Sequence, residues 1–97
     1  MNSRNGSAPR FALGQVLATP GAIEALEQSQ VRAGDLLYRH VTGDWGDLCE
    51  EDKQQNERSL RIGARIFSSY LLPTGEKIWV ITEADRSATT FLLPIEY

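Results

Sequence analysis

The sequence is poor in the residues that build covalent or metal-bound frameworks. Its 97 residues include one cysteine and one histidine. A single thiol, Cys49, forms no disulfide framework and supplies too few ligands for a thiolate-rich metal site. One histidine without cysteine or carboxylate at ligand spacing also argues against a zinc site. We therefore expect neither a metal nor another cofactor.

Membrane and export signals are also missing. No apolar stretch approaches the roughly 20 residues that span a bilayer, and the first ten residues lack the apolar centre of a signal peptide. We therefore expect a cytoplasmic protein with no membrane partner. Residues 1–10 are mostly Asn, Ser, Gly, Pro and Arg, which is typical of a flexible leader. A single folded domain is expected over residues 11–97.

Positive charge is scarce for a protein that binds nucleic acid through its phosphates. Ten Lys and Arg residues stand against 13 Asp and Glu residues, so the net charge is −3 at pH 7. Nonspecific nucleic-acid binders are usually basic, because phosphate neutralisation supplies most of their affinity. Any contact with RNA would therefore need a local basic patch. The chain is also too short for a separate cofactor-binding module.

What the sequence does contain is the pattern of a small α+β domain. A short apolar segment at residues 11–18 predicts a leading strand, in which Gly14 allows a bulge. Thr19 and Pro20 signal a helix start, because threonine caps a first turn and proline fits the first helical position. Helical spacing and charge order predict two or three helices. Their ranges are 20–30, 33–41 and, with sparser apolar positions, 50–63.

The C-terminal third predicts an antiparallel meander of three strands. Pro73, Thr74 and Gly75 suit a type I turn closed by a glycine bulge, which sets the register of the two strands beside it. A second polar turn at residues 84–87 reverses the chain again. The resulting register pairs Leu72 with Glu76, Tyr70 with Ile78, Ser68 with Val80, Ile66 with Thr82, Thr82 with Thr89 and Val80 with Phe91.

This register gives both faces of the meander apolar side chains, because successive residues of a strand point to opposite faces. One face carries Ile66, Ser68, Tyr70, Ile78, Val80, Thr82, Thr89, Phe91 and Leu93. The opposite face carries Arg65, Phe67, Ser69, Leu71, Lys77, Trp79, Ile81, Glu83, Thr90 and Leu92. Three short helices can cover one face of a small sheet, but they rarely cover both faces. Trp79, Phe67 and Ile81 are therefore predicted to form an exposed patch, a dimer surface or a partner site.

Three segments resemble a family of short bacterial proteins carried on plasmids and integrated mobile elements. They read ATPGA at residues 18–22, RHVTGDWGDL at 39–48 and WVITEADRSATT at 79–90. Members are usually labelled plasmid-related proteins, and sometimes type I restriction endonuclease subunit M. A methyltransferase subunit needs a cofactor-binding domain, and this chain has neither the length nor a Gly-rich loop for one. The resemblance, which covers nearly everything after the leader, therefore implies a mobile-element protein.

The order of the elements has a second resemblance, at the level of fold alone. Helices followed by an antiparallel meander, with a histidine on a helix and a threonine-rich last hairpin, resemble the barnase/RelE-like ribonucleases. No diagnostic motif of that superfamily is present. The likeness implies RNA as one candidate partner.

The polar residues of the last hairpin include the groups that RNA cleavage needs. In-line attack by a 2′-hydroxyl requires a base, an acid and a cation that stabilises the phosphorane charge. Glu83 is the candidate base, His40 the candidate acid and Arg86 the clamp. The candidate substrate-binding residues are Thr82, Thr89, Thr90, Asp44 and Tyr70. Each also has an ordinary structural interpretation, as a satisfied helix-end histidine, a turn residue, a strand former or a loop cap.

Two functions of different classes therefore stay open. The first is a ribonuclease-like or RNA-binding accessory protein with its site between His40 and residues 82–90. The second is a non-enzymatic interaction module that binds a host or element-encoded protein, or a second copy of itself, around Trp79. The acidic net charge favours the second and the polar set favours the first. The position of His40 separates them, because a catalytic histidine must reach a cleft shared with Glu83 and Arg86.

Overall fold

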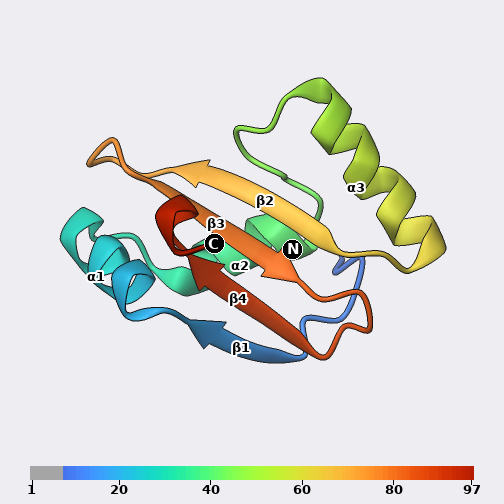
Figure 1. Cartoon of the computed structure of the whole chain (residues 1–97), viewed down its shortest axis with the longest axis horizontal. Coiled ribbons are helices and arrows are strands. Elements are labelled where there is room, and N and C mark those ends of the chain that lie inside the picture. Colours follow the sequence, from blue (N-terminus) through green and yellow to red (C-terminus); the bar gives the residue numbers. More distant parts are fainter. Residues whose placement is uncertain (1–7) are drawn as a thin grey trace, which may run out of the picture.

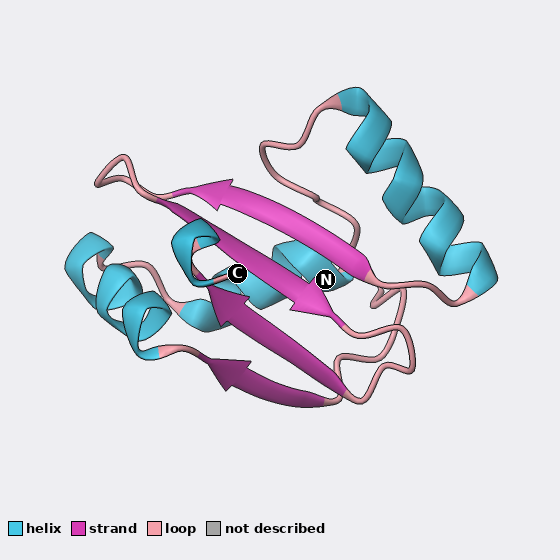
Figure 2. Cartoon of the chain, in the orientation of Figure 1, coloured by secondary structure: helices cyan, strands magenta, loops and turns pink. Residues whose placement is uncertain are grey.

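The structure, a computed structural model, describes residues 8–97 and has the α+β architecture that the sequence predicts. The elements in chain order are β1 (Gln15–Ala18), α1 (Pro20–Ser29), α2 (Ala33–Val41), α3 (Glu50–Ile62), β2 (Ile66–Leu71), β3 (Lys77–Thr82), β4 (Ala88–Leu92) and a 3-10 turn, η2 (Pro94–Glu96). Figures 1 and 2 show the sheet with α2 behind it, α3 beyond the β2 edge and η2 in front. None of the helices within residues 8–97 is long and apolar enough to cross a membrane.

The four strands form one mixed sheet in the order β1-β4-β3-β2. The β2–β3 and β3–β4 pairs are antiparallel, and their register is the predicted one, with Tyr70 opposite Ile78 and Thr82 opposite Thr89. β1 adds to β4 in parallel, with Val16 opposite Thr89. The sequence did not place β1, because a four-residue apolar segment does not specify which edge it joins.

The leading strand is shorter than the predicted range of 11–18. It begins at Gln15, because Gly14 has a φ of +66°, a left-handed conformation that interrupts an extended chain and favours glycine. A Cβ on Gly14 would lie 2.4 Å from the carbonyl carbon of Ser87, so this close backbone approach also requires glycine. Residues 1–7 of the expected leader lie outside the described residues. Arg10, its last residue, donates its backbone N–H to Val41 at 2.8 Å.

The hydrophobic core lies between the sheet and the two helices α1 and α2. Its buried members are Ala22, Ala25, Leu26, Leu36, Tyr70, Leu72, Ile78, Val80 and Phe91. Ala22, Ala25 and Leu26 recur at helical spacing, so one stripe of α1 packs on the sheet. Burying a large apolar side chain stabilises the fold by roughly 1.5–3 kcal/mol relative to leaving it exposed. One sheet face is therefore fully used by packing within the chain.

The outer edge of β2 is closed by the chain itself. The side-chain amide of Asn56 in α3 donates to Phe67 O at 2.6 Å, and its oxygen accepts from Phe67 N at 3.1 Å. The backbone of the loop at residues 45–47 forms hydrogen bonds with the N–H and the carbonyl of Ser69. The Asp47 carboxylate in this loop accepts from Leu71 N at 2.8 Å. An edge whose backbone groups already have partners does not recruit another strand.

Candidate functional site

His40 lies inside the protein and not in a cleft. It is 0% exposed on the side of α2 that faces the sheet. Its Nδ1 is 2.6 Å from Ser68 Oγ, and its Nε2 is 2.9 Å from Thr82 Oγ1. The rings of Phe11 and Trp45 stand edge-on to the imidazole, with centroids at 5.2 and 6.1 Å. Both ring nitrogens thus have partners within the fold.

These partners continue into a chain of hydrogen bonds with a single direction, which we call the buried polar chain (Ser68, His40, Thr82, Thr89 and the carbonyl of Leu13). Thr89 Oγ1 gives its only proton to Leu13 O at 2.7 Å, because a carbonyl can only accept. Thr82 Oγ1, which is 2.7 Å from Thr89 Oγ1, must then donate to it. Thr82 therefore accepts from His40 Nε2–H. When the imidazole is neutral, its single proton is thus on Nε2, and Nδ1 accepts from Ser68 Oγ.

Burial keeps the imidazole neutral. It lowers the pKa of His40 to about 4, since the charged form loses its hydration when the ring is enclosed. A general acid needs access to its substrate and a pKa near the working pH. In this geometry His40 has neither, and its hydrogen bonds instead join α2 to β2 and β3.

Arg86 is half-buried, and its guanidinium donates to backbone carbonyls. Its guanidinium donates to Ala64 O at 2.7 Å and Glu83 O at 3.1 Å. It also donates to Ala84 O at 3.2 Å and Ser59 O at 3.4 Å. Ser59 and Ala64 lie at the C-terminal end of α3, where the helix dipole favours a cation. Arg86 thus joins the β3–β4 turn to α3, while the side chain of Glu83 is exposed.

An aromatic ring bridges the two candidate catalytic groups His40 and Arg86. The Phe11 ring centroid is 5.2 Å from that of His40 and 5.7 Å from the guanidinium carbon of Arg86. The space shared by these two side chains is therefore occupied by a hydrocarbon ring. The structure gathers His40, Thr82 and Thr89, but it gathers them as a buried structural unit.

The other candidate binding residues are held by ordinary contacts. Tyr70 is buried, its hydroxyl donates to Asp44 O at 2.7 Å, and burial raises the pKa of Tyr70. The Asp44 carboxylate pairs with Arg39 at 2.7 Å, which holds the pKa of Asp44 below its usual value. It also accepts from Gly46 N at 3.2 Å. Thr90 lies on the other sheet face, half-buried. In residues 8–97, no three His, Cys, Asp or Glu side chains gather as metal ligands would.

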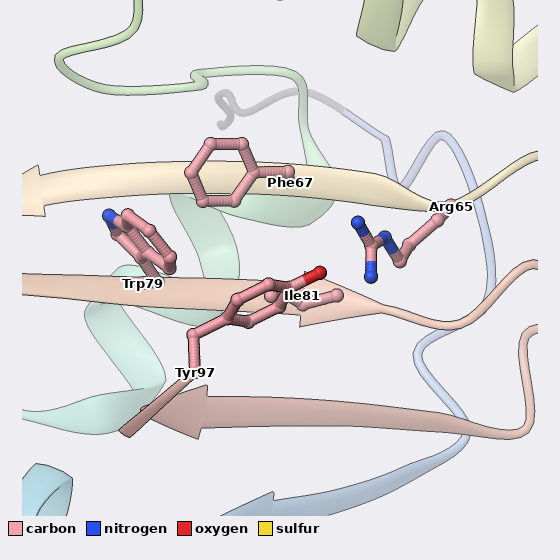
Figure 3. A pocket seen from close by; sticks show the side chains of 5 residues that line it. All are labelled: Arg65, Phe67, Trp79, Ile81 and Tyr97. Carbon is pink, nitrogen blue, oxygen red and sulfur yellow. The ribbon is translucent and has the colours of Figure 1, made fainter. Parts of the chain in front are cut away.

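An open pocket lies on the sheet face opposite α1 and α2. It has a volume of about 200 Å³ and is lined by Arg65, Phe67, Trp79, Ile81 and Tyr97, which we call the aromatic pocket. Figure 3 shows the three aromatic rings around Ile81, with Arg65 at one end. Trp79 meets Phe67 edge to face at 5.0 Å and Tyr97 at 5.7 Å. Four of these five residues belong to the face that the sequence predicted to be uncovered.

Tyr97 is the member of the pocket that the sequence did not reveal. It follows the last strand, and η2 folds it back over the sheet. Glu96 holds this turn, because its Oε1 accepts from Thr19 Oγ1 at 2.5 Å and from Leu93 N at 2.8 Å. Thr19 caps α1 by accepting from Ala22 N at 3.1 Å, and its bond to Glu96 lowers the pKa of that carboxyl. The only sequence signal was Pro94, which ends a strand and starts a turn.

Gly21→Ala should detach this wall of the pocket without harming α1. A Cβ at Gly21 would lie 2.5 Å from Glu96 Oε2, so the carboxylate must move away. Alanine itself favours the helix by up to about 1 kcal/mol. We expect the nuclear Overhauser contacts between Trp79 and Tyr97 to weaken. Gly34→Ala, at the second position of α2 with nothing within 4 Å of its Cβ, should leave them unchanged. Equal contacts in both variants would contradict the role of Glu96.

No protein-family model, curated protein or solved structure matches this chain. The resemblance to plasmid-related proteins and the likeness to barnase/RelE-like ribonucleases stay predictions. Because a fold alone does not define a function, the function must be argued from the sites themselves.

Proposed function

We propose that this protein is a non-enzymatic interaction module that binds a partner protein through the aromatic pocket around Trp79. The observation that carries the proposal is the contrast between the two sheet faces. One face is covered by α1 and α2, and the other presents three aromatic rings around an open pocket. Tryptophan, tyrosine and arginine are the residue types that dominate binding energy at protein interfaces.

Two elements that carry or adjoin pocket residues also have exposed apolar side chains. Leu71 belongs to the same face of β2 as Phe67 and is 58% exposed, and Ile95 in η2 is 92% exposed. Tyr97, a wall of the pocket, is 67% exposed. Contiguous apolar surface marks interaction sites, and Trp79 is in contact with both Phe67 and Tyr97 on this face. Since the backbone groups of the β2 edge are taken, a partner would bind this face and not extend the sheet beyond β2.

The ribonuclease hypothesis receives less support from the same geometry. Of its proposed catalytic groups, His40 is buried, Arg86 is half-buried and bonded to four backbone carbonyls, and Glu83 is exposed. General acid and base must both touch one substrate. The net charge of −3 adds no attraction for RNA.

A peptide library displayed on phage and selected against the full chain tests the proposal. Bound peptides should shift the backbone amide signals of residues 65–71, 77–81 and 95–97. Trp79→Ala and Tyr97→Ala should each reduce their binding at least about tenfold, as truncation of a central interface residue does. Ile23→Ala removes a comparably exposed apolar side chain from α1 and should change nothing.

Two results would overturn the interaction module. One is a set of selected peptides that bind Trp79→Ala and Tyr97→Ala as well as they bind the unaltered chain. The other is cleavage of total RNA by the purified protein that is lost in a folded His40→Gln variant. Of Trp79→Ala and Tyr97→Ala, the second is less prone to unfold the protein, because an exposed side chain contributes little to folding stability.

A further inference from the structure

The composition of the aromatic pocket restricts what kind of segment it can bind, and this step rests on the proposed function. Three aromatic rings in one pocket are the usual arrangement for capturing a cationic group. Here the protein supplies the cation itself. The guanidinium carbon of Arg65 is 5.6 Å from the ring centroid of Tyr97, within range of a cation–π contact. A second positive charge in so small a pocket would be repelled.

Arg65 has donor groups to spare. An arginine side chain carries five N–H donors arranged to meet a carboxylate with two parallel bonds. Within residues 8–97, neither of the ion pairs involves Arg65, and none of its N–H groups has a hydrogen bond to a side chain. Ile66 pairs with Thr82, so Glu83, the next residue after Thr82, lies near Arg65, the residue before Ile66. Glu83 and Arg65 do not form an ion pair. The pocket therefore presents an unpaired cation beside an apolar floor.

The size of the pocket fits one large side chain. Its volume of about 200 Å³ is below the range of sites that hold drug-sized molecules and cofactors. Its floor, Ile81, is 6% exposed and apolar, so a hydrocarbon group gains by entering. The open rim leaves room for the chain on either side of that group.

We propose that the aromatic pocket binds an acidic segment of a partner protein. One large apolar side chain of that segment enters between Trp79 and Tyr97, and a neighbouring carboxylate pairs with Arg65. Lys77, exposed on the same face of β3 as Trp79, adds a second positive charge along the segment's path. These two cations are complementary to an acidic ligand, although the chain as a whole carries a net charge of −3.

Four capped hexapeptides that differ only at their two central residues test this chemistry. Their centres are Asp-Phe, Asn-Phe, Lys-Phe and Asp-Ala, and binding is followed through the indole N–H signal of Trp79. The Asp-Phe peptide should bind about three- to tenfold more tightly than the Asn-Phe peptide, and the Lys-Phe peptide should bind least of the three. The Asp-Ala peptide should leave the Trp79 signal unmoved.

Arg65→Gln should remove the preference for Asp over Asn, whereas Arg58→Gln, an exposed arginine of α3, should keep it. Equal binding of the Asp-Phe and Asn-Phe peptides to the unaltered chain would overturn the acidic segment and leave the interaction module standing. If the Lys-Phe peptide binds more tightly than the Asp-Phe peptide, the pocket binds cationic and not acidic segments. If none of the four peptides moves the Trp79 signal while library peptides do, the acidic segment is also wrong. If neither set binds this face, both proposals fail.

Discussion

Replacing His40 with alanine should lower the free energy of unfolding by about 3–5 kcal/mol. The substitution removes a wholly buried ring and leaves a cavity among Phe11, Trp45 and the sheet. It also takes away the imidazole partner of the buried Ser68 hydroxyl and the donor to Thr82 Oγ1, which keeps only its bond to Thr89. An orphaned buried polar group costs about 1–3 kcal/mol, so the cavity and the lost bonds act in the same direction. Urea denaturation followed by far-ultraviolet circular dichroism measures the change.

Arg39→Ala is the matched control for this prediction. Arg39 is the neighbour of His40 on α2 and forms an ion pair with Asp44. The side chains of Arg39 and Asp44 are 44% and 51% exposed. Its guanidinium also lies over the Tyr70 ring, 4.5 Å from the centroid. An exposed ion pair contributes about 0.2–1 kcal/mol and an exposed cation–π contact about 0.5–1 kcal/mol, so this variant should lose no more than about 2 kcal/mol. A His40→Ala protein as stable as Arg39→Ala would show that the buried polar chain does not hold the fold.

The sequence predicted the elements and most of the sheet because local rules govern them. Thr19 and Pro20 placed the start of α1, and the Pro73–Gly75 turn set the β2–β3 register residue by residue. The leading strand itself was predicted, but its place in the sheet was not, since the parallel pairing of β1 with β4 joins segments about 70 residues apart and no turn connects them. Such a contact depends on the assembled core and not on a local signal.

The candidate site was harder to predict because polar residues occupy both faces of the sheet. Ser68, Thr82 and Thr89 share strand parity with Ile66 and Val80, and the predicted register already placed them on one face. Which face the helices would cover was not determined by that register. Because α2 covers the face that carries Ser68, Thr82 and Thr89, their hydroxyl groups are enclosed. Hydroxyl groups that would suit a substrate site are instead partners of the buried polar chain around the His40 imidazole. A helix position four residues after buried Leu36 was the signal for an inward His40.

The stability of the protein should fall as the pH drops from 7.5 to 5, before most carboxylates titrate. The folded-state pKa of His40 is about 4, below its ordinary value of 6.5, so the unfolded chain takes up the proton first. Protonation therefore favours unfolding, and the contribution of His40 is complete above pH 6.5 and lost as the pH falls toward 4. The expected loss is about 2 kcal/mol by pH 5 and about 3 kcal/mol by pH 4. Urea denaturation at half-unit intervals of pH measures it.

His40→Gln separates this histidine from the carboxylates. Glu57 and Glu96 have pKa values lowered by their hydrogen bonds, so they too lose stability in acid, but only below their ordinary value of 4.5. The variant should be less stable at neutral pH, and its stability should stay flat between pH 7.5 and 5. A slope equal to that of the unaltered chain in this window would mean that His40 does not cause it. A directly measured imidazole pKa near 6.5 would likewise contradict this pH dependence. A proton on Nδ1 in place of Nε2 would contradict the direction of the buried polar chain, because Thr82 gives its proton to Thr89 and needs one from His40 Nε2.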